Sequence, residues 1–165
     1  MFLSTDDVEI FSFLGYLYAL YGLSHLQPML TKKYLKDLVY RVNGAAIEVH
    51  KRLGPGLLEK VYQKCLEYEL SIRGIKFNSE LKIPYNYKGV DLDLNLRCDL
   101  LIEDTLVVEL KSVEQVLPIH EAQLISYMKL LDLPMGLLIN FNVENIYYKG
   151  QSTYVNETFR FLPEI

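Results

Sequence analysis

The chain has 165 residues, half of them hydrophobic, which is enough for one compact domain with a sizeable core and too few for two independent domains. Its formal net charge of -4 excludes a protein that coats nucleic acid through overall positive charge, although a local basic patch or a metal-bridged phosphate contact stays compatible with it. The two cysteines, Cys65 and Cys98, show no CxxC spacing. We therefore expect buried free thiols and a reducing, cytoplasmic location.

Residues 1–33 read as an apolar N-terminal extension, and residues 34–165 as the domain proper. The dense apolar part of the extension, Ile10 to Leu23, is shorter than the roughly 20 residues that a bilayer span requires. Acidic residues precede it, where a secretory signal would carry basic ones. We expect an accessory helix that packs on the domain or on a second copy in a homodimer, with a membrane span as the less favoured alternative.

The segment from Lys32 onward predicts two consecutive helices. Apolar residues recur at helical spacing from Leu35 to Leu53, and the string LGPG (53–56) is typical of a helix end. Gly74 is placed to end the second helix in a left-handed conformation. In that second helix we expect one buried apolar stripe. The stripe consists of Leu58, Val61, Cys65, Tyr68 and Ile72.

Three strands are predicted next. IKFNSELKIPYNYKG (75–89) reads as extended, and Pro84 indicates an edge position or a strand end. DLDLNLRCDLLI (91–102) alternates strictly between apolar and polar residues, as a half-buried strand does, and TLVVELK (105–111) returns as its partner.

The last third of the chain predicts a helix, a buried strand and a hairpin. The amphipathic helix runs from about Ile119 to Leu131, and GLLIN (136–140) is a short buried strand. The tail is expected to turn back on itself about Lys149 and Gly150. The predicted order of helix, helix, three strands, helix and strand is that of an α/β (α+β) domain with a mixed sheet flanked by helices.

The minority face of the two central strands carries Asp99, Glu109 and Lys111, and the loop between the strands decides whether these residues meet. With a two-residue turn, Asp99 would face Val108, and the two carboxylates would lie on opposite sides of the sheet. With a loop of three or five residues, Asp99 lies opposite Glu109, with Cβ atoms about 5 Å apart. Only a loop with an odd number of residues places both carboxylates on the same face of the sheet, where they can form a site.

Two carboxylates this close repel each other by about 3 kcal/mol at an effective dielectric constant near 20, so the arrangement requires counter-charge. Lys111 supplies one positive charge, and a divalent metal would supply two. Ligands that are all oxygen suit a hard cation such as Mg²⁺ or Mn²⁺, which acts on phosphates by polarising them and activating water. The alternative is a solvated sheet face on which Glu109 and Lys111 form an ordinary surface ion pair.

Four strings follow one another along the chain: GLLEKVY (56–62), RCDLLIEDTLVVELKS (97–112), QLISYMKLL (123–131) and MGLLINF (135–141). This ordered set resembles the GxxExxY family of bacterial and archaeal proteins, within the PD-(D/E)XK nuclease superfamily, over about residues 38–141. The resemblance implies a restriction-endonuclease-like core of helix, three strands, helix and strand.

The same resemblance implies a metal site and the roles of its residues. Asp99 and Glu109 would hold the metal together with the backbone carbonyl of Leu110, and Glu59 would complete the shell or orient water. Lys111 and Gln123 would handle the nucleophile and the phosphate. The implied catalytic residues are Glu59, Asp99, Glu109, Lys111 and Gln123.

Three further residues are candidates for contact with nucleic acid. Lys51 and Arg52 lie in a locally basic first helix, although an ordinary solvated helix face explains them equally well. Tyr127 stands four residues after Gln123, on the same helical face. Tyr62 likewise shares the helical face of Glu59, and the pair could close over the site.

The sequence is compatible with two functions. The first is a Mg²⁺-dependent nuclease that hydrolyses phosphodiester bonds of DNA or RNA. The second is a catalytically silent module on the same scaffold that binds nucleic acid or another protein. Retention of every acidic position and of the lysine favours the nuclease.

Overall fold

The computed structural model describes residues 30–165, and residues 31–165 form one compact unit. The predicted N-terminal extension therefore lies outside the described residues, apart from residues 30–33. Every helix in the described part of the chain is too short or too polar to cross a membrane.

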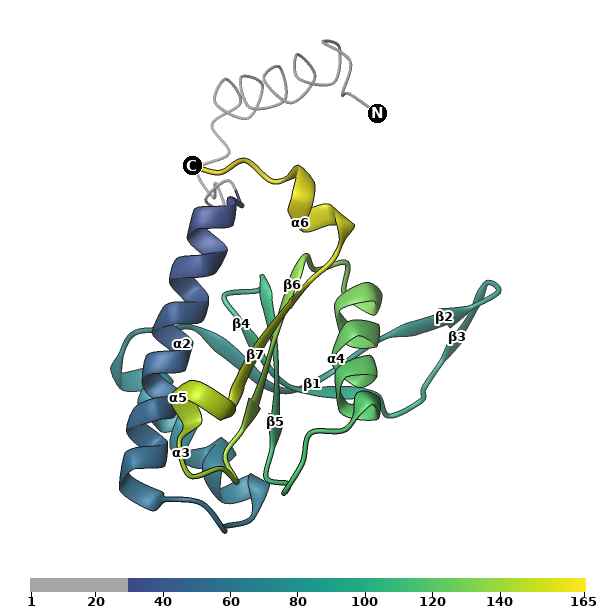
Figure 1. Cartoon of the computed structure of the whole chain (residues 1–165). Coiled ribbons are helices and arrows are strands. Elements are labelled where there is room, and N and C mark those ends of the chain that lie inside the picture. The colour runs from purple at the N-terminus through teal and green to yellow at the C-terminus, as the bar shows by residue number, and fades with distance from the viewer. Residues whose placement is uncertain (1–29) are drawn as a thin grey trace. The chain divides into compact units, whose positions relative to one another are not determined.

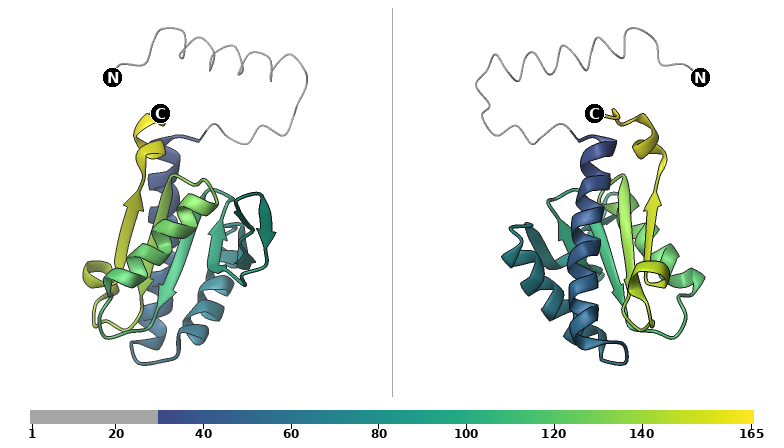
Figure 2. Two further views of the ribbon diagram at one scale, coloured as in Figure 1. Left: turned by 90° about the vertical axis from the view of Figure 1, so that its right-hand side faces the viewer. Right: turned by 60° about the vertical axis from the view of Figure 1, so that its left-hand side comes forward.

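A five-stranded mixed sheet forms the centre of this unit (Figure 1). Its strands lie in the order β1 (Phe77–Lys82), β4 (Arg97–Ile102), β5 (Leu106–Lys111), β6 (Met135–Asn140) and β7 (Gln151–Val155). β5 and β6 are parallel, and the other neighbours are antiparallel. Helix α4 (Pro118–Leu130) makes the crossover between the parallel pair and covers one face of the sheet, and α2 (Lys32–Leu53) crosses the other face (Figure 2).

Helix α2 forms as its sequence predicts. The Thr31 side chain accepts the backbone N–H of Tyr34 at 3.0 Å and caps the N-terminus. The apolar stripe from Leu35 to Val49 is buried against the sheet. At the other end, Gly54 adopts φ +67° and its N–H donates to the His50 carbonyl at 2.8 Å, so the helix ends at the predicted turn.

Helix α3 (Glu59–Ile72) buries a different face from the predicted one. Tyr62, Leu66 and Leu70 are fully buried, whereas Leu58 is 78% exposed and Ile72 is 60% exposed. The predicted stripe is therefore wrong. Both sets of residues recur at helical spacing, so periodicity alone could not choose between them. The choice is made by Tyr62, whose ring stacks on Phe141, the residue after β6, with centroids 4.5 Å apart; the two residues are far apart in the sequence.

The rotation of α3 also changes the environment of one cysteine. Cys98 is fully buried, as expected, but Cys65 is only half-buried and lines an open pocket together with Val49 and Leu53 of α2. Both are free thiols. The expectation of two buried thiols is thus correct for Cys98 alone.

The long alternating strand predicted over 91–102 is divided in two. Its first part forms β3 (Val90–Leu92), which pairs with β2 (Tyr85–Tyr87) in a separate two-stranded hairpin that stands away from the main sheet (Figure 1). Its second part is β4. Asn95 has φ +52° between them, a left-handed conformation that interrupts a strand, and Leu94 is 48% exposed. The alternation continued through this break, and for that reason the sequence pattern concealed it.

The C-terminal hairpin predicted about Lys149 and Gly150 is also wrong. The chain forms α5 (Ile146–Lys149), then β7, then α6 (Glu157–Phe161). The side chains of Asn145 and Asn156 each accept a backbone N–H three residues on, which starts a helical turn at the two places. β7 pairs antiparallel with β6, the preceding strand, instead of with the residues just before Lys149.

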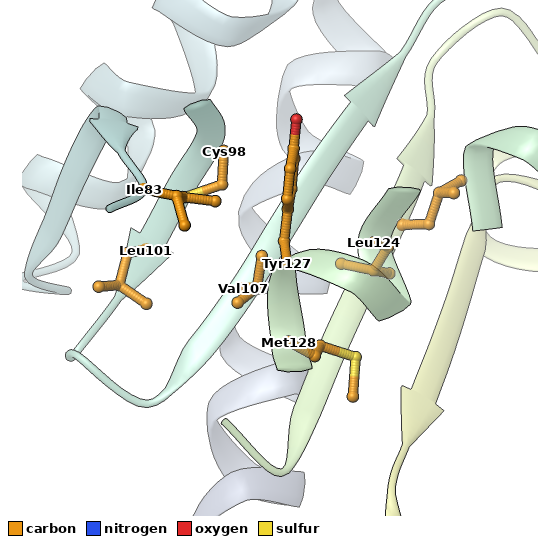
Figure 3. Close-up of a cluster of buried hydrophobic side chains, with 8 residues drawn as sticks. Ile83, Cys98, Leu101, Val107, Leu124, Tyr127 and Met128 are labelled. Carbon is orange, nitrogen blue, oxygen red and sulfur yellow. The ribbon is translucent and has the colours of Figure 1, made fainter. Parts of the chain in front are cut away.

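The core beneath α4 positions that helix against the strands. Figure 3 shows Tyr127, Leu124 and Met128 from α4 beside Val107 of β5, within a cluster of buried side chains. Gly136 of β6 lies directly below: a Cβ there would come within 2.7 Å of the Met128 sulfur and 2.8 Å of Leu124 Cδ1. The glycine therefore allows α4 to pack closely on the sheet.

Candidate active site

The loop between β4 and β5 has three residues, 103–105. Leu100 pairs with Val108 and Ile102 pairs with Leu106, which leaves that loop between them. This register excludes the two-residue turn, in which Asp99 would have faced Val108. Extending the same register by one residue pair places Asp99 opposite Glu109.

Below the Leu100–Val108 pair, the two strands stop pairing through their backbones. The Asp99 backbone N–H donates instead to Glu109 Oε1 at 3.3 Å, and the Leu110 N–H donates to Asp99 Oδ2 at 2.7 Å. Each carboxylate thus takes the place of a backbone acceptor. The two acids lie side by side at the point where the strands separate.

Burial and mutual repulsion make this pair of carboxylates hard to ionise. Glu109 is 2% exposed, and burial followed by the charge of Asp99 raises its pKa to about 7. Burial also raises the pKa of Asp99, against the opposing effect of the Leu110 N–H. Lys111 Nζ lies 3.2 Å from Glu109 Oε2 and lowers the pKa of both acids, but one ammonium does not offset two buried carboxylates.

Glu59 is the first residue of α3 and faces the same region. Burial raises the pKa of its half-buried carboxyl, the charge of Lys111 lowers it, and the charge of Asp99 raises it. The Ser112 hydroxyl donates to the Leu57 carbonyl at 2.6 Å, which ties the end of β5 to the start of α3. Glu59 is thereby held within electrostatic reach of the strand residues.

Glu59 nevertheless does not complete a cluster of three carboxylates. Within residues 30–165, no three His, Cys, Asp or Glu side chains are grouped closely enough to hold a metal ion by themselves. The structure thus brings together Asp99, Glu109 and Lys111, and places Glu59 beside them rather than among them.

The tyrosine of the GxxExxY string has a buried position. The Tyr62 hydroxyl donates to the Gly54 carbonyl at 2.7 Å and accepts the Leu57 N–H at 3.1 Å. These bonds hold the loop that precedes Glu59. Because Tyr62 is fully buried, the interpretation that it closes over the site is wrong, and it instead supports the segment from which Glu59 projects.

The other predicted residues lie on two helices. Gln123 is half-buried on α4, and its Nε2 donates to the Tyr127 hydroxyl at 3.1 Å. Tyr127 is buried in the cluster of Figure 3. Lys51 and Arg52 are exposed at the end of α2, where Arg52 pairs with Glu48 at 2.8 Å.

Glu80 of β1 also lies near the site, although the sequence pattern did not indicate it. The register of β1 and β4 places Glu80 opposite Asp99, at a backbone φ of +51°, and its charge raises the pKa of Asp99. Lys60, next to Glu59 in sequence, pairs with Glu80 at 2.6 Å. Only the pairing of β1 with β4 connects Glu80 to the site, and the sequence pattern of FNSELK carries no sign of it.

His120, near the start of α4, was missed as well. Its imidazole lies within electrostatic reach of the Glu59 carboxyl. The histidine stands three residues before Gln123, and this helical spacing was the available signal.

The donor atoms of the site fit a hard divalent cation. Asp99 and Glu109 offer carboxylate oxygens, which Mg²⁺ and Mn²⁺ prefer. Burial raises both carboxyl pKa values, the charge of Asp99 adds to the effect on Glu109, and a bound cation would supply the positive charge that stabilises both ionised carboxylates. With only two acidic side chains in the pair, backbone carbonyl and water oxygens would have to supply the remaining ligands.

A mixed sheet flanked by helices, with an aspartate and an ExK sequence meeting where two central strands separate, defines a restriction-endonuclease-like fold. The chain matches the family model of the PD-(D/E)XK nuclease superfamily over residues 36–151. It therefore belongs to the PD-(D/E)XK nuclease superfamily, and the predicted fold class is confirmed. No curated protein and no solved structure matches the chain.

Proposed function

We propose that the protein is a divalent-metal-dependent nuclease that hydrolyses phosphodiester bonds of DNA or RNA. The observation that carries the proposal is the pair of Asp99 and Glu109, buried side by side with Lys111 Nζ 3.2 Å from Glu109, in a chain of this superfamily. A solvated surface ion pair would have neither the burial nor the raised pKa of Glu109.

In this proposal Asp99, Glu109 and the backbone carbonyl of Leu110 hold Mg²⁺ or Mn²⁺, with Glu59 completing the shell or orienting water. When bound, the cation would supply positive charge that polarises the phosphate and makes a bound water more acidic.

The chain's own side chains perform the remaining tasks. Lys111 keeps 12% of its side chain exposed, so its ammonium can orient the attacking water and offset charge on the phosphate. Glu59, with a raised pKa, can accept a hydrogen bond or a proton from that water. Gln123 can exchange its bond to Tyr127 for one to a phosphate oxygen.

A cleavage screen with a matched pair of lysine variants tests the proposal. Single-stranded, duplex and branched DNA and RNA are incubated with the protein and either Mg²⁺ or Mn²⁺. We expect cleavage that depends on the metal and falls by roughly 100-fold or more in Lys111→Ala. Lys64→Ala is the control, because Lys64 is exposed and forms an ion pair with Glu67 of the same helix.

Equal cleavage by both variants would trace the activity to a contaminant and refute the proposal. Binding of nucleic acid without cleavage under either metal would favour the silent module instead.

The domain boundaries and the cellular setting belong to the same proposal. We place the nuclease domain at residues 34–165, with residues 1–33 as an accessory extension and a possible contact in a homodimer. The free thiols of Cys65 and Cys98 support a reducing compartment such as the cytoplasm.

A further inference from the structure

His120 is held in one orientation at the start of α4. Its Nδ1 accepts the Leu117 backbone N–H at 3.1 Å, and its own backbone N–H donates to the Leu117 carbonyl at 2.9 Å. A neutral imidazole whose Nδ1 accepts a hydrogen bond carries its proton on Nε2. The outer nitrogen of this half-buried ring is therefore a hydrogen-bond donor.

That donor has no partner among residues 30–165, and its helix faces the site. His120, Gln123 and Tyr127 follow one another at i, i+3 and i+7 and so share one face of α4. Tyr127 packs in the same buried cluster as Val107 of β5 (Figure 3). The face that carries His120 is thus the face that α4 turns toward the strands of the Asp99–Glu109 pair.

Glu59 of helix α3 also indicates that the His120 imidazole lies near the site. Burial raises the pKa of the Glu59 carboxyl at the start of α3, and this carboxyl lies within electrostatic reach of both Lys111 and His120. Ser112, the residue after Lys111, is bonded to Leu57 just before α3. The start of α3 therefore lies beside the end of β5, near Lys111, and the His120 imidazole is close enough to influence the Glu59 carboxyl there.

We propose that His120 is a phosphate-binding residue, whose Nε2–H donates to a non-bridging oxygen of the phosphodiester group held beside Asp99 and Glu109. This inference rests on the proposed nuclease function and deepens it. Asp99, Glu109 and the nearby Glu59 are carboxyl groups that surround the Lys111 ammonium, while the Lys60 ammonium is paired with Glu80. An additional donor offsets the repulsion between these carboxyl groups and an anionic substrate.

The competing explanation is that His120 only caps α4, and two substitutions separate the roles of its ring nitrogens. His120→Asn keeps an acceptor near the position of Nδ1 and removes the outer donor. His120→Gln keeps a donor near the position of Nε2 and removes the acceptor that caps the helix.

We expect His120→Asn to melt at the wild-type temperature and to lose about 10- to 100-fold in affinity for nucleic acid, the size expected for a hydrogen bond to a charged group. We expect His120→Gln to melt at a lower temperature and to keep most of the affinity. Fluorescence anisotropy with fluorescein-labelled DNA and RNA oligonucleotides in metal-free buffer measures affinity without turnover.

Wild-type affinity in His120→Asn would overturn the inference, as would equal losses in the two variants or a wild type that binds no oligonucleotide. A wild type that binds but never cleaves would refute the nuclease proposal alone, and the comparison of the two variants would still decide the role of His120. Where cleavage is present, the same ranking of variants is expected in kcat/KM.

Discussion

Asp99 and Glu109 link the two central strands through their side chains at the point where backbone pairing ends. The Glu109 carboxylate accepts the N–H of Asp99 at 3.3 Å, and the Asp99 carboxylate accepts the N–H of Leu110 at 2.7 Å. Both carboxylates therefore have a structural role in addition to the proposed role in metal binding. Substitutions at these positions must be chosen so that the two roles are separated.

Asp99→Asn and Asp99→Ala separate them. Asparagine keeps an acceptor for the Leu110 N–H and removes a repelling charge, so without metal it should unfold at the wild-type temperature or above. Alanine leaves that buried N–H unpaired and should lower the free energy of unfolding by about 1–3 kcal/mol. Mg²⁺ should stabilise the wild type alone, because a ligand that prefers the native state raises its stability. Thermal melts with and without Mg²⁺ measure both effects, and an equal Mg²⁺ shift in wild type and Asp99→Asn would contradict the metal site.

The raised pKa of Glu109 predicts how the stability of the protein depends on pH. The pKa of this carboxyl in the folded protein, about 7, lies above the ordinary value of 4.5, so between these values the folded state binds more protons than the unfolded state. The contribution of this group to stability is then greatest at low pH and is lost as the pH rises through the folded pKa. Chemical denaturation from about pH 5 to about pH 8 should show the wild type losing stability relative to Glu109→Gln. Parallel curves for the two proteins would rule out the raised pKa.

Tyr62→Phe tests the support beneath Glu59. The variant keeps the ring that stacks on Phe141 but removes the hydroxyl bonds to Gly54 and Leu57. We expect a loss of about 1–3 kcal/mol in the free energy of unfolding, and slower cleavage because the start of α3 is less firmly held. Tyr68→Phe, on the exposed side of the same helix, should change stability by less than about 0.5 kcal/mol. Indistinguishable melts for the two variants would show that the Tyr62 hydroxyl contributes nothing.

Gly136→Ala tests the close packing of α4 on the sheet. The added methyl group would meet Met128 and Leu124, so we expect a loss of about 1–3 kcal/mol from overpacking. Gly44→Ala is the matched control within helix α2, where the new Cβ would meet only Arg73, at 3.5 Å. That variant should gain up to about 1 kcal/mol, because alanine favours a helix over glycine. Calorimetric melts of both variants decide the point, and a stabilised Gly136→Ala would show that α4 is not packed as described.

The sequence predicted those elements whose apolar residues leave a single choice of buried face. Helix α2 has that property, and strands β5 and β6 are short apolar runs buried on both faces. The parity of the β4–β5 loop was enough to restrict Asp99 and Glu109 to two arrangements. The pairing of β4 with β5 then brought the acids together, and no further information from outside these strands was needed.

The errors arose where a distant contact decided the outcome. Helix α3 offers two apolar faces, and the stack of Tyr62 on Phe141 selects one of them. The alternation of 91–102 continues through the left-handed Asn95, so the β2–β3 hairpin was hidden. Glu80 reaches the site only through the pairing of β1 with β4. Each of these contacts joins segments that local patterns treat separately.

Asp99 has a structural role as well as its proposed metal-binding role. The structural role limits which substitutions at this position could be tolerated in a related protein that no longer cleaves nucleic acid. Replacement by an aliphatic residue would leave the buried N–H of Leu110 without an acceptor and would destabilise the two central strands. Replacement by the corresponding amide would remove the proposed cation ligand and keep an acceptor for the Leu110 N–H. Among homologues that have given up catalysis, drift should therefore favour amides over aliphatic side chains at this position, and an amide there would mark a lineage that kept the scaffold for another use.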